Sequence, residues 1–191
     1  MLAVITAPCA QRGSPTSPDV QQLVVAIADD DNSNYGKIRL FSRDERGNWR
    51  QDSDTWRANF GKNGLAWGIG LHPRQRGKQK KEGDLRTPSG VFRIGKVLGN
   101  PPEPPSGHNG WPYHQKTEND AWPEDPQNQY YNRLYTKKSG YEPAWFTKER
   151  FKLTDPTYYW LVVVDHNRQR KSIDDENIKA EPARGSAIFM H

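Results

Sequence analysis

The chain has 191 residues, of which only 33% are hydrophobic, and its mean hydropathy is −1.03. The length suits one domain, or one domain with a tail. Seven Trp, eight Tyr and six Phe predict that its core is modest and rich in aromatic rings. The single cysteine, Cys9, excludes an intrachain disulfide and a cysteine-built zinc site.

The net charge of +5 is compatible with nucleic acid, an anionic cell envelope or no specific partner. Positive charge is concentrated between His72 and Arg86, where six basic and two acidic residues give a net +4. No aromatic residues alternate with these basic residues as in a single-strand binder, and no nucleic-acid reader motif is present. We therefore expect no nucleic-acid partner. A solvated loop is the simpler interpretation, and contact with an anionic polymer is the alternative.

The first 20 residues differ in character from the rest. Leu2 to Ala7 is apolar but too short to span a membrane. It resembles the end of a signal peptide, with a frayed N-terminus as the alternative. Residues 12–18 have the Ser, Pro and Gly content of a linker. We expect a signal-peptide remnant and linker at 1–20, a domain at 21–191, no membrane span, and a periplasmic or secreted location.

Along the domain, apolar runs bounded by turn residues predict strands. The predicted strands are 22–28, 37–42, 55–60, 91–98, 158–164 and 185–191, with a hairpin turn at 44–48. The five prolines between 99 and 112 predict a loop, and 142–152 is the best candidate for a helix, a short one. The 16 glycines and 15 prolines also favour β structure over long helices. The fold is therefore predicted to be mostly β with few short helices.

Residues 81–92 (Lys-Glu-Gly-Asp-Leu-Arg-Thr-Pro-Ser-Gly-Val-Phe) form a charged turn that leads into a strand. Gly83 and Gly90 can adopt backbone angles closed to other residues, and Pro88 favours extended geometry at Thr87. The polar side chains between them predict a fixed cluster in which Arg86 forks onto a carboxylate. A solvated loop remains the alternative.

The order K-x-G-D-x-R-T-P-x-G-x-F in this block resembles the signature of the L,D-transpeptidase catalytic-domain family, the YkuD-type cell-wall enzymes. The resemblance extends over about 22–191 and includes Gly-Lys-Asn-Gly-Leu-Ala-Trp-Gly, a "DP…YNR" run and the ending Gly-Ser-Ala-Ile-Phe-Met-His. It implies a β-sandwich, acyl transfer on peptidoglycan stem peptides by a cysteine, and no cofactor.

His166 and His191 each stand at the end of a predicted strand. From the residues alone, a structural hydrogen bond is the simpler role for His166, and His191 is a terminal residue. The resemblance implies that His191 is the general base, and that an [S/T]-x-G-C motif with the nucleophilic cysteine follows it.

The sequence printed here ends at His191, so this motif lies outside it, and Cys9 has no motif around it. We expect a domain that is incomplete at its C-terminus, with a non-catalytic wall-binding remnant as the alternative function. No metal site is expected, since no two histidines are spaced i, i+3 or i+4. The residues expected to contact substrate are Arg86, Ser186, His166, Tyr131 and Arg133. The residues expected to shape the turn are Gly83, Asp84, Thr87, Pro88 and Gly90.

Overall fold

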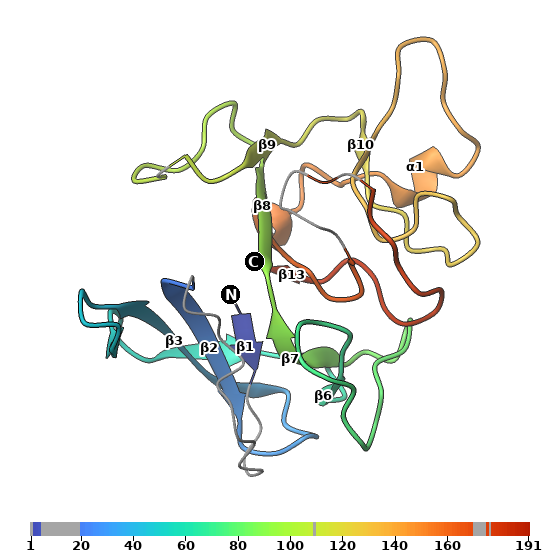
Figure 1. Ribbon diagram of the computed structural model, residues 1–191. Coiled ribbons are helices and arrows are strands. Elements are labelled where there is room, and N and C mark those ends of the chain that lie inside the picture. Colours follow the sequence, from blue (N-terminus) through green and yellow to red (C-terminus); the bar gives the residue numbers. More distant parts are fainter. Residues whose placement is uncertain (1, 5–19, 109, 170–174, 176) are drawn as a thin grey trace. The chain divides into compact units, whose positions relative to one another are not determined.

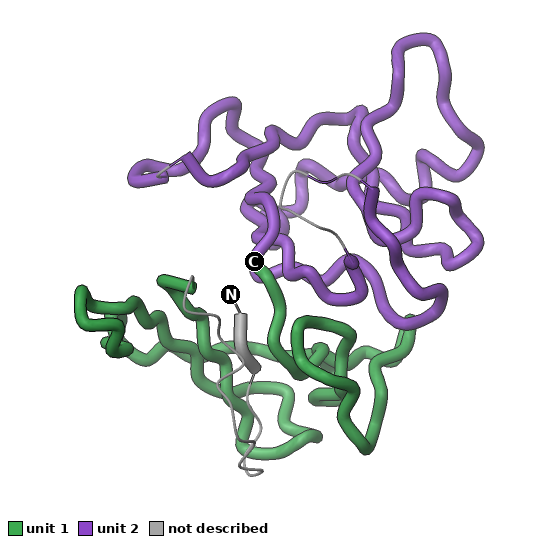
Figure 2. Tube along the Cα trace, viewed as in Figure 1, with its two compact units in different colours: residues 1–93 green, residues 94–191 purple. Residues whose placement is uncertain are grey.

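The computed structural model describes residues 2–4, 20–108, 110–169, 175 and 177–191, and of residues 2–4 only the backbone. Within these residues the chain is mostly β, which confirms the predicted fold class, and α1 (Phe146–Glu149) is its one α-helix. The chain divides into two compact units, residues 1–93 and 94–191 (Figures 1 and 2). Each unit has a sheet of its own.

The sheet of the first unit has the strand order β4-β3-β2-β1-β7-β6, and β5 pairs with β3. Its strands are β1 (Leu2–Val4), β2 (Gln22–Ala28), β3 (Tyr35–Arg43), β4 (Trp49–Gln51), β5 (Trp56–Asn59), β6 (Leu65–Trp67) and β7 (Thr87–Phe92). The longest pairing is antiparallel, between β2 and β3, and β6 lies parallel to β7. Continuous burial from Pro88 to Phe92 makes β7 the most buried strand of this sheet, as its small and apolar side chains allow.

The N-terminal segment enters this sheet. The backbone of Leu2–Val4 pairs in parallel with β2 and antiparallel with β7. The linker predicted at 12–18 lies outside the described residues. The signal-peptide interpretation of residues 1–20 remains a prediction.

The second unit contains a four-stranded sheet in the order β13-β12-β8-β9. These strands are β8 (Ile94–Gly99), β9 (Tyr113–Gln115), β12 (Trp160–Val164) and β13 (Phe189–Met190), and a separate pair is formed by β10 (Asp120–Ala121) and β11 (Tyr135–Thr136). A core of Leu98, Leu161, Val163 and Trp122 covers one face of the sheet. Trp122 therefore ties the long excursion between β9 and β12 to the sheet.

Three predicted elements differ from those observed by more than two residues at one end or both. The strand predicted at 91–98 is divided at Arg93 into β7 and β8, and the predicted helix is reduced to the four residues of α1. The final strand is only two residues long, because Gly185 (φ +98°) and Ala187 (φ +52°) leave the extended region. In the part of the chain that the structure describes, no helix has the length and apolar character needed to cross a membrane.

Candidate functional site

Asp84 organises the turn of the first unit. Its carboxylate accepts hydrogen bonds from Lys80 Nζ at 2.5 Å and from the backbone N–H groups of Lys81 at 2.8 Å and Arg86 at 2.9 Å. Burial alone would raise the pKa of Asp84, but these hydrogen bonds outweigh it and lower that pKa below its ordinary value. Lys80 is 5% exposed, so the pair is a buried element of the turn rather than part of a solvated loop.

The glycine turn at residues 61–64 packs directly against this block. The hydroxyl of Thr87 accepts from the N–H of Gly61 at 2.8 Å, and Asn63 Nδ2 donates to the carbonyl of Asp84 at 3.0 Å. A side chain on Gly61 would overlap the backbone of Leu85 and Arg86. The two segments therefore pack without space for a side chain at position 61, which accounts for the glycine there.

Two further glycines of the block have conformations that favour glycine. Gly83 has a φ of +68°, and Gly90 has a φ of +141° with its Cα against the ring of His72. His72 Nδ1 in turn accepts the N–H of Val91 at 3.0 Å. The turn is thus fixed at both ends.

Arg86 does not fork onto a carboxylate, and this prediction is wrong. Its Nη1 donates to the carbonyl oxygens of Leu65 at 2.9 Å and Asp31 at 3.2 Å. The guanidinium therefore joins the loop before β3 to β6. The expectation that Arg86 contacts substrate is distinct from the expectation about its partner, and it stays a prediction.

Of the six basic residues from His72 to Arg86, only two have side chains that are bonded within the described part of the fold. Lys80 and Arg86 are bonded inside the unit, whereas the four remaining cations are exposed and have no ion-pair partner among the described residues. They are Arg74, Arg76, Lys78 and Lys81.

In the second unit, Asn132 is the centre of a buried polar network. It is 1% exposed and has a φ of +58°, a conformation that asparagine tolerates better than most residues. Its Nδ2 donates to the carbonyls of His166 at 3.1 Å and Asn167 at 3.0 Å. Its Oδ1 accepts from Trp122 Nε1 at 3.3 Å and from the N–H of Ala187 at 3.2 Å. All four hydrogen bonds available to an asparagine side chain are made.

The Asp165-His166-Asn167 segment that follows β12 is almost completely buried. The Nε2 atom of His166 lies 2.9 Å from the carbonyl oxygen of Arg184. Asn167 Nδ2 donates to the carbonyl oxygens of Glu181 and Gly185. These bonds hold the backbone that leads into β13. With no exposed surface, His166 has the geometry of a structural residue, and its contact with substrate stays a prediction.

Arg168 completes the network. Its Nε lies 3.1 Å from Asp165 Oδ1, its Nη1 donates to the carbonyl oxygen of Asn132, and its guanidinium lies 4.7 Å from the ring centroid of Trp122. Arg168 and Asp165 are both almost fully buried. Their opposite charges are therefore paired within the network, as burial requires.

The predicted base, His191, directly follows β13. This strand is held by pairing with β12, Val163 with Phe189 and Val162 with Met190. His191 itself is exposed, and its ring centroid lies 5.2 Å from that of Tyr158. Ser186 is 6% exposed and lies between two residues that bond to the network, so its backbone position is fixed.

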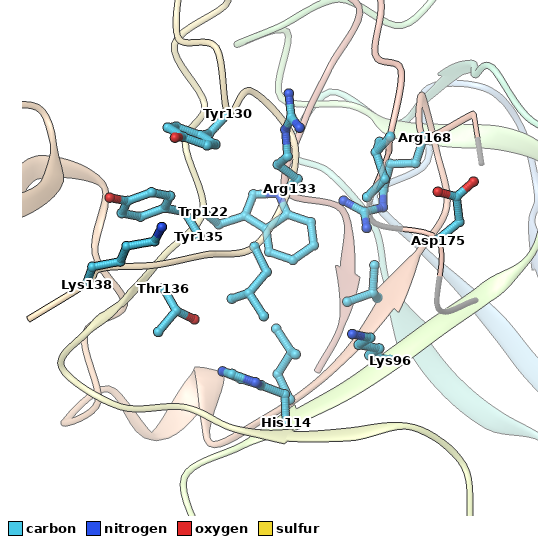
Figure 3. Close-up of a pocket in the computed structure, with 14 residues that line it drawn as sticks. Lys96, His114, Trp122, Tyr130, Arg133, Tyr135, Thr136, Lys138, Arg168 and Asp175 are labelled. Carbon is cyan, nitrogen blue, oxygen red and sulfur yellow. The ribbon is translucent and has the colours of Figure 1, made fainter. Parts of the chain in front are cut away.

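A pocket of about 450 Å³ lies over the sheet of the second unit (Figure 3). Lys96 and Leu98 of β8, His114 of β9 and Val163 of β12 contribute to its lining. The excursion and the segment after β12 supply Trp122, Tyr130, Arg133, Leu134, Tyr135, Thr136, Lys138, Arg168, Asp175 and Ile178. Arg133 thus lies in the pocket wall, whereas Tyr131, at 6% exposure, is buried beside it.

One histidine of the pocket lies beside a buried carboxylate. His114 Nε2 lies 3.1 Å from Asp120 Oδ2, and Asp120 also accepts from Thr136 Oγ1 at 2.6 Å and from Thr117. Burial raises the pKa of Asp120, but the hydrogen bonds from His114, Thr136 and Thr117 outweigh this effect and lower it overall. Among the residues whose positions are described, no group of three or more His, Cys, Asp or Glu side chains could hold a metal ion.

The structure therefore brings Ser186, His166 and Arg133 into the second unit, and leaves Arg86 and the turn residues in the first. The sequence interpretation missed Asn132 as the centre of the network, and it missed Arg168 and the His114–Asp120 pair. A buried Asn with a positive φ has no signature in a single sequence. The only available signal was the cluster of polar residues directly after the most apolar strand.

A family model described as the L,D-transpeptidase catalytic domain (YkuD) matches residues 42–191. Neither the curated proteins nor the solved structures contain a match to the chain. The matched region spans the turn block, the polar network, the pocket and β13, which is most of the chain. The chain therefore belongs to the L,D-transpeptidase catalytic-domain family, a family of enzymes that act on peptidoglycan.

Proposed function

We propose that the gene product containing this chain is a cysteine-dependent L,D-transpeptidase or carboxypeptidase of the bacterial envelope, periplasmic or secreted. The observation that carries the proposal is the family match, which reaches His191. The strand leading to this histidine is paired with β12, and the backbone before it is bonded to Asn132 and Asn167. A base on such a support keeps its position during turnover.

In the proposed reaction, the imidazole of His191 accepts the proton of a cysteine thiol that follows in the gene product. The thiolate attacks the carbonyl between the L-centre and the terminal D-Ala of a stem tetrapeptide. The peptide C–N bond breaks, the imidazolium returns the proton to the leaving amine of D-Ala, and a thioester remains. An amine of a second stem peptide or a water molecule then takes the acyl group and regenerates the thiol.

The test uses the gene product expressed from residue 1 of this sequence to the stop codon of the gene. With a stem tetrapeptide as substrate, mass spectrometry should detect a protein-bound acyl adduct and free D-Ala. The His191→Gln variant should lower the rate at least ~100-fold, the usual range for loss of a general base, without a change in urea midpoint. His108→Gln, outside the proposed machinery, is the matched control. Unchanged turnover in His191→Gln, or no adduct and no D-Ala from the parent protein, would contradict the proposal.

A second candidate function is non-catalytic binding to an anionic wall polymer. The supporting observation is the row of exposed cations at Arg74, Arg76, Lys78 and Lys81. Binding should then weaken as salt increases, because exposed charges are screened. Co-sedimentation with purified sacculi across a salt series tests this, with Arg74, Arg76 and Lys78 changed to Gln as the comparison. An absence of sedimentation at low salt would exclude this function.

A further inference from the structure

The pocket of the second unit combines unpaired positive charge with an aromatic wall (Figure 3). We infer that it binds a small molecule that carries an oxyanion, either a carboxylate or a phosphate, on a flat apolar body. This inference concerns a binding site and does not depend on the acyl transfer proposed above.

The charges of the pocket lining are strongly unbalanced. Four basic residues contribute to it, Lys96, Arg133, Lys138 and Arg168, against the single acid Asp175. Arg168 is neutralised by Asp165. For Lys96, Arg133 and Lys138, by contrast, the described part of the chain supplies no carboxylate partner.

Arg133 gives the most specific indication of a ligand. Its Nη2 donates to the carbonyl of Gln129 and its guanidinium lies 5.6 Å from the ring centroid of Tyr130, which together fix the side chain. Its Nε is buried and has no hydrogen-bond partner in the described residues. An unpaired buried donor costs free energy unless a ligand or water satisfies it. A guanidinium fork is suited to the two oxygens of a carboxylate or phosphate.

Asp120 does not cancel this charge within the cavity. It is 1% exposed, its two oxygens accept hydrogen bonds from Thr117 and Thr136, and Oδ2 lies 3.1 Å from His114 Nε2. Its carboxylate is therefore occupied by these hydroxyl and backbone donors and lies beside His114, whose ring lines the pocket.

Much of the remaining wall is made of aromatic rings. Tyr130 and Tyr135 pack with ring centroids 4.5 Å apart, and Trp122 is held between Arg168 and Phe189. In Figure 3, Lys138 and Lys96 lie on opposite sides of Trp122. The cavity volume is within the range of sites for small organic ligands. Aromatic sides with a few cations are an arrangement that suits an anion on an aromatic body.

The experiment uses three probes with the same flat body: benzoate, phenyl phosphate and the neutral benzamide. Binding is followed in the 15N-labelled protein by the indole N–H signal of Trp122, which Trp122→Phe assigns. We expect saturable shifts with benzoate or phenyl phosphate at millimolar concentrations and none with benzamide. A preference for benzoate identifies a carboxylate ligand, and a preference for phenyl phosphate identifies a phosphate ligand.

Arg133→Gln and Lys138→Gln should each weaken anion binding by about tenfold, the effect of losing one charge-assisted hydrogen bond. Lys148→Gln removes the same charge from an exposed position outside the pocket and should leave binding unchanged. Lys138 is also exposed, so its variant remains folded and keeps the test decisive even if Arg133→Gln unfolds. No saturable shift with either anion, equal shifts with benzamide, or an unchanged affinity in Lys138→Gln would overturn the inference. None of these binding measurements requires turnover. The acyl-transfer proposal is tested by the adduct and D-Ala measurements, so either proposal can fail without the other.

Discussion

The side-chain amide of Asn132 donates a hydrogen bond to the carbonyl oxygen of His166 at 3.1 Å, across 34 positions of sequence. The same side chain accepts the N–H of Ala187, at the start of the approach to β13. A single buried amide therefore links the segment after β12 to the segment before β13. Asn132 is one of the residues that position the C-terminal strand, together with Asn167 and the pairing with β12.

We predict that Asn132→Ala lowers the free energy of unfolding by about 3 kcal/mol. The substitution leaves several buried backbone groups and the Trp122 N–H without partners, and each such group is costly. Urea denaturation measures the effect. Asn119→Ala, at an exposed position of the same unit, is the control and should change stability by less than about 0.5 kcal/mol. Similar values for the two variants would show that the network is not a main source of stability.

A second prediction separates backbone strain from steric overlap at two glycines of the same turn. Gly83→Ala should cost about 1 kcal/mol, because φ is positive but no atom lies near the added methyl group. Gly90→Ala should cost about 3–4 kcal/mol, since a Cβ there also overlaps the His72 ring. Urea midpoints of the two variants test the ranking. His72→Ala combined with Gly90→Ala should recover part of the loss, and equal effects of the two single variants would contradict this account.

The sequence of the turn block predicted these glycines correctly because the information is local. A glycine followed by Asp, and a glycine after Thr-Pro-Ser, each indicate a backbone that other residues avoid. The partner of Arg86 was predicted wrongly because it depends on tertiary structure. The carbonyl oxygens of Asp31 and Leu65 come from 55 and 21 positions away, and no local pattern indicates them.

The same distinction applies to the second unit. The apolar run ending at Val164 identified the central strand, since its burial follows from composition. The length of β13 was overestimated because the positive φ of Ala187 is imposed by the loop that Asn132 and Asn167 hold. The pocket was missed because its cations and rings are brought together only by folding of the excursion onto the sheet.

A third prediction concerns the buried ion pair of Lys80 and Asp84. Asp84→Asn should reduce stability at neutral pH by about 3 kcal/mol, because it leaves the Lys80 ammonium buried without its counter-charge. The pKa of Asp84 is lowered in the folded protein, so unfolded chains bind the proton more readily. The stabilisation is therefore present above the ordinary pKa of 3.8 and is lost as pH falls through the folded value.

The measurement is a series of urea denaturations of wild type and Asp84→Asn between about pH 7 and pH 3. The difference between them should shrink at the acid end. Asp54→Asn, an exposed residue of the same unit, should match wild type at neutral pH within about 0.5 kcal/mol. A difference that stays constant over the whole range would show that Asp84 contributes through shape rather than charge.

A fourth prediction concerns Lys116, a cation that is 2% exposed. Its Nζ donates to the carbonyl of Tyr158 and lies 5.5 Å from the ring centroid of Phe151, and the described residues give it no acidic partner. Burial lowers the pKa of Lys116 below its ordinary value of 10.5. Between the folded value and 10.5 the unfolded chain therefore carries more protons, and stability should rise with pH in that window.

Lys116→Met removes the titrating group and keeps most of the volume, so this rise should be reduced when stability is followed from neutral pH up to about pH 10. At neutral pH the variant should lie within about 1 kcal/mol of wild type, since relief of the buried charge offsets the loss of a donor to Tyr158. Lys148→Met, at an exposed position, should keep the wild-type slope. The series stops at pH 10, because Tyr113 and Tyr135 have raised pKa values and would lower stability above it. If Lys116→Met retains the full slope, the ammonium is not desolvated in the folded protein.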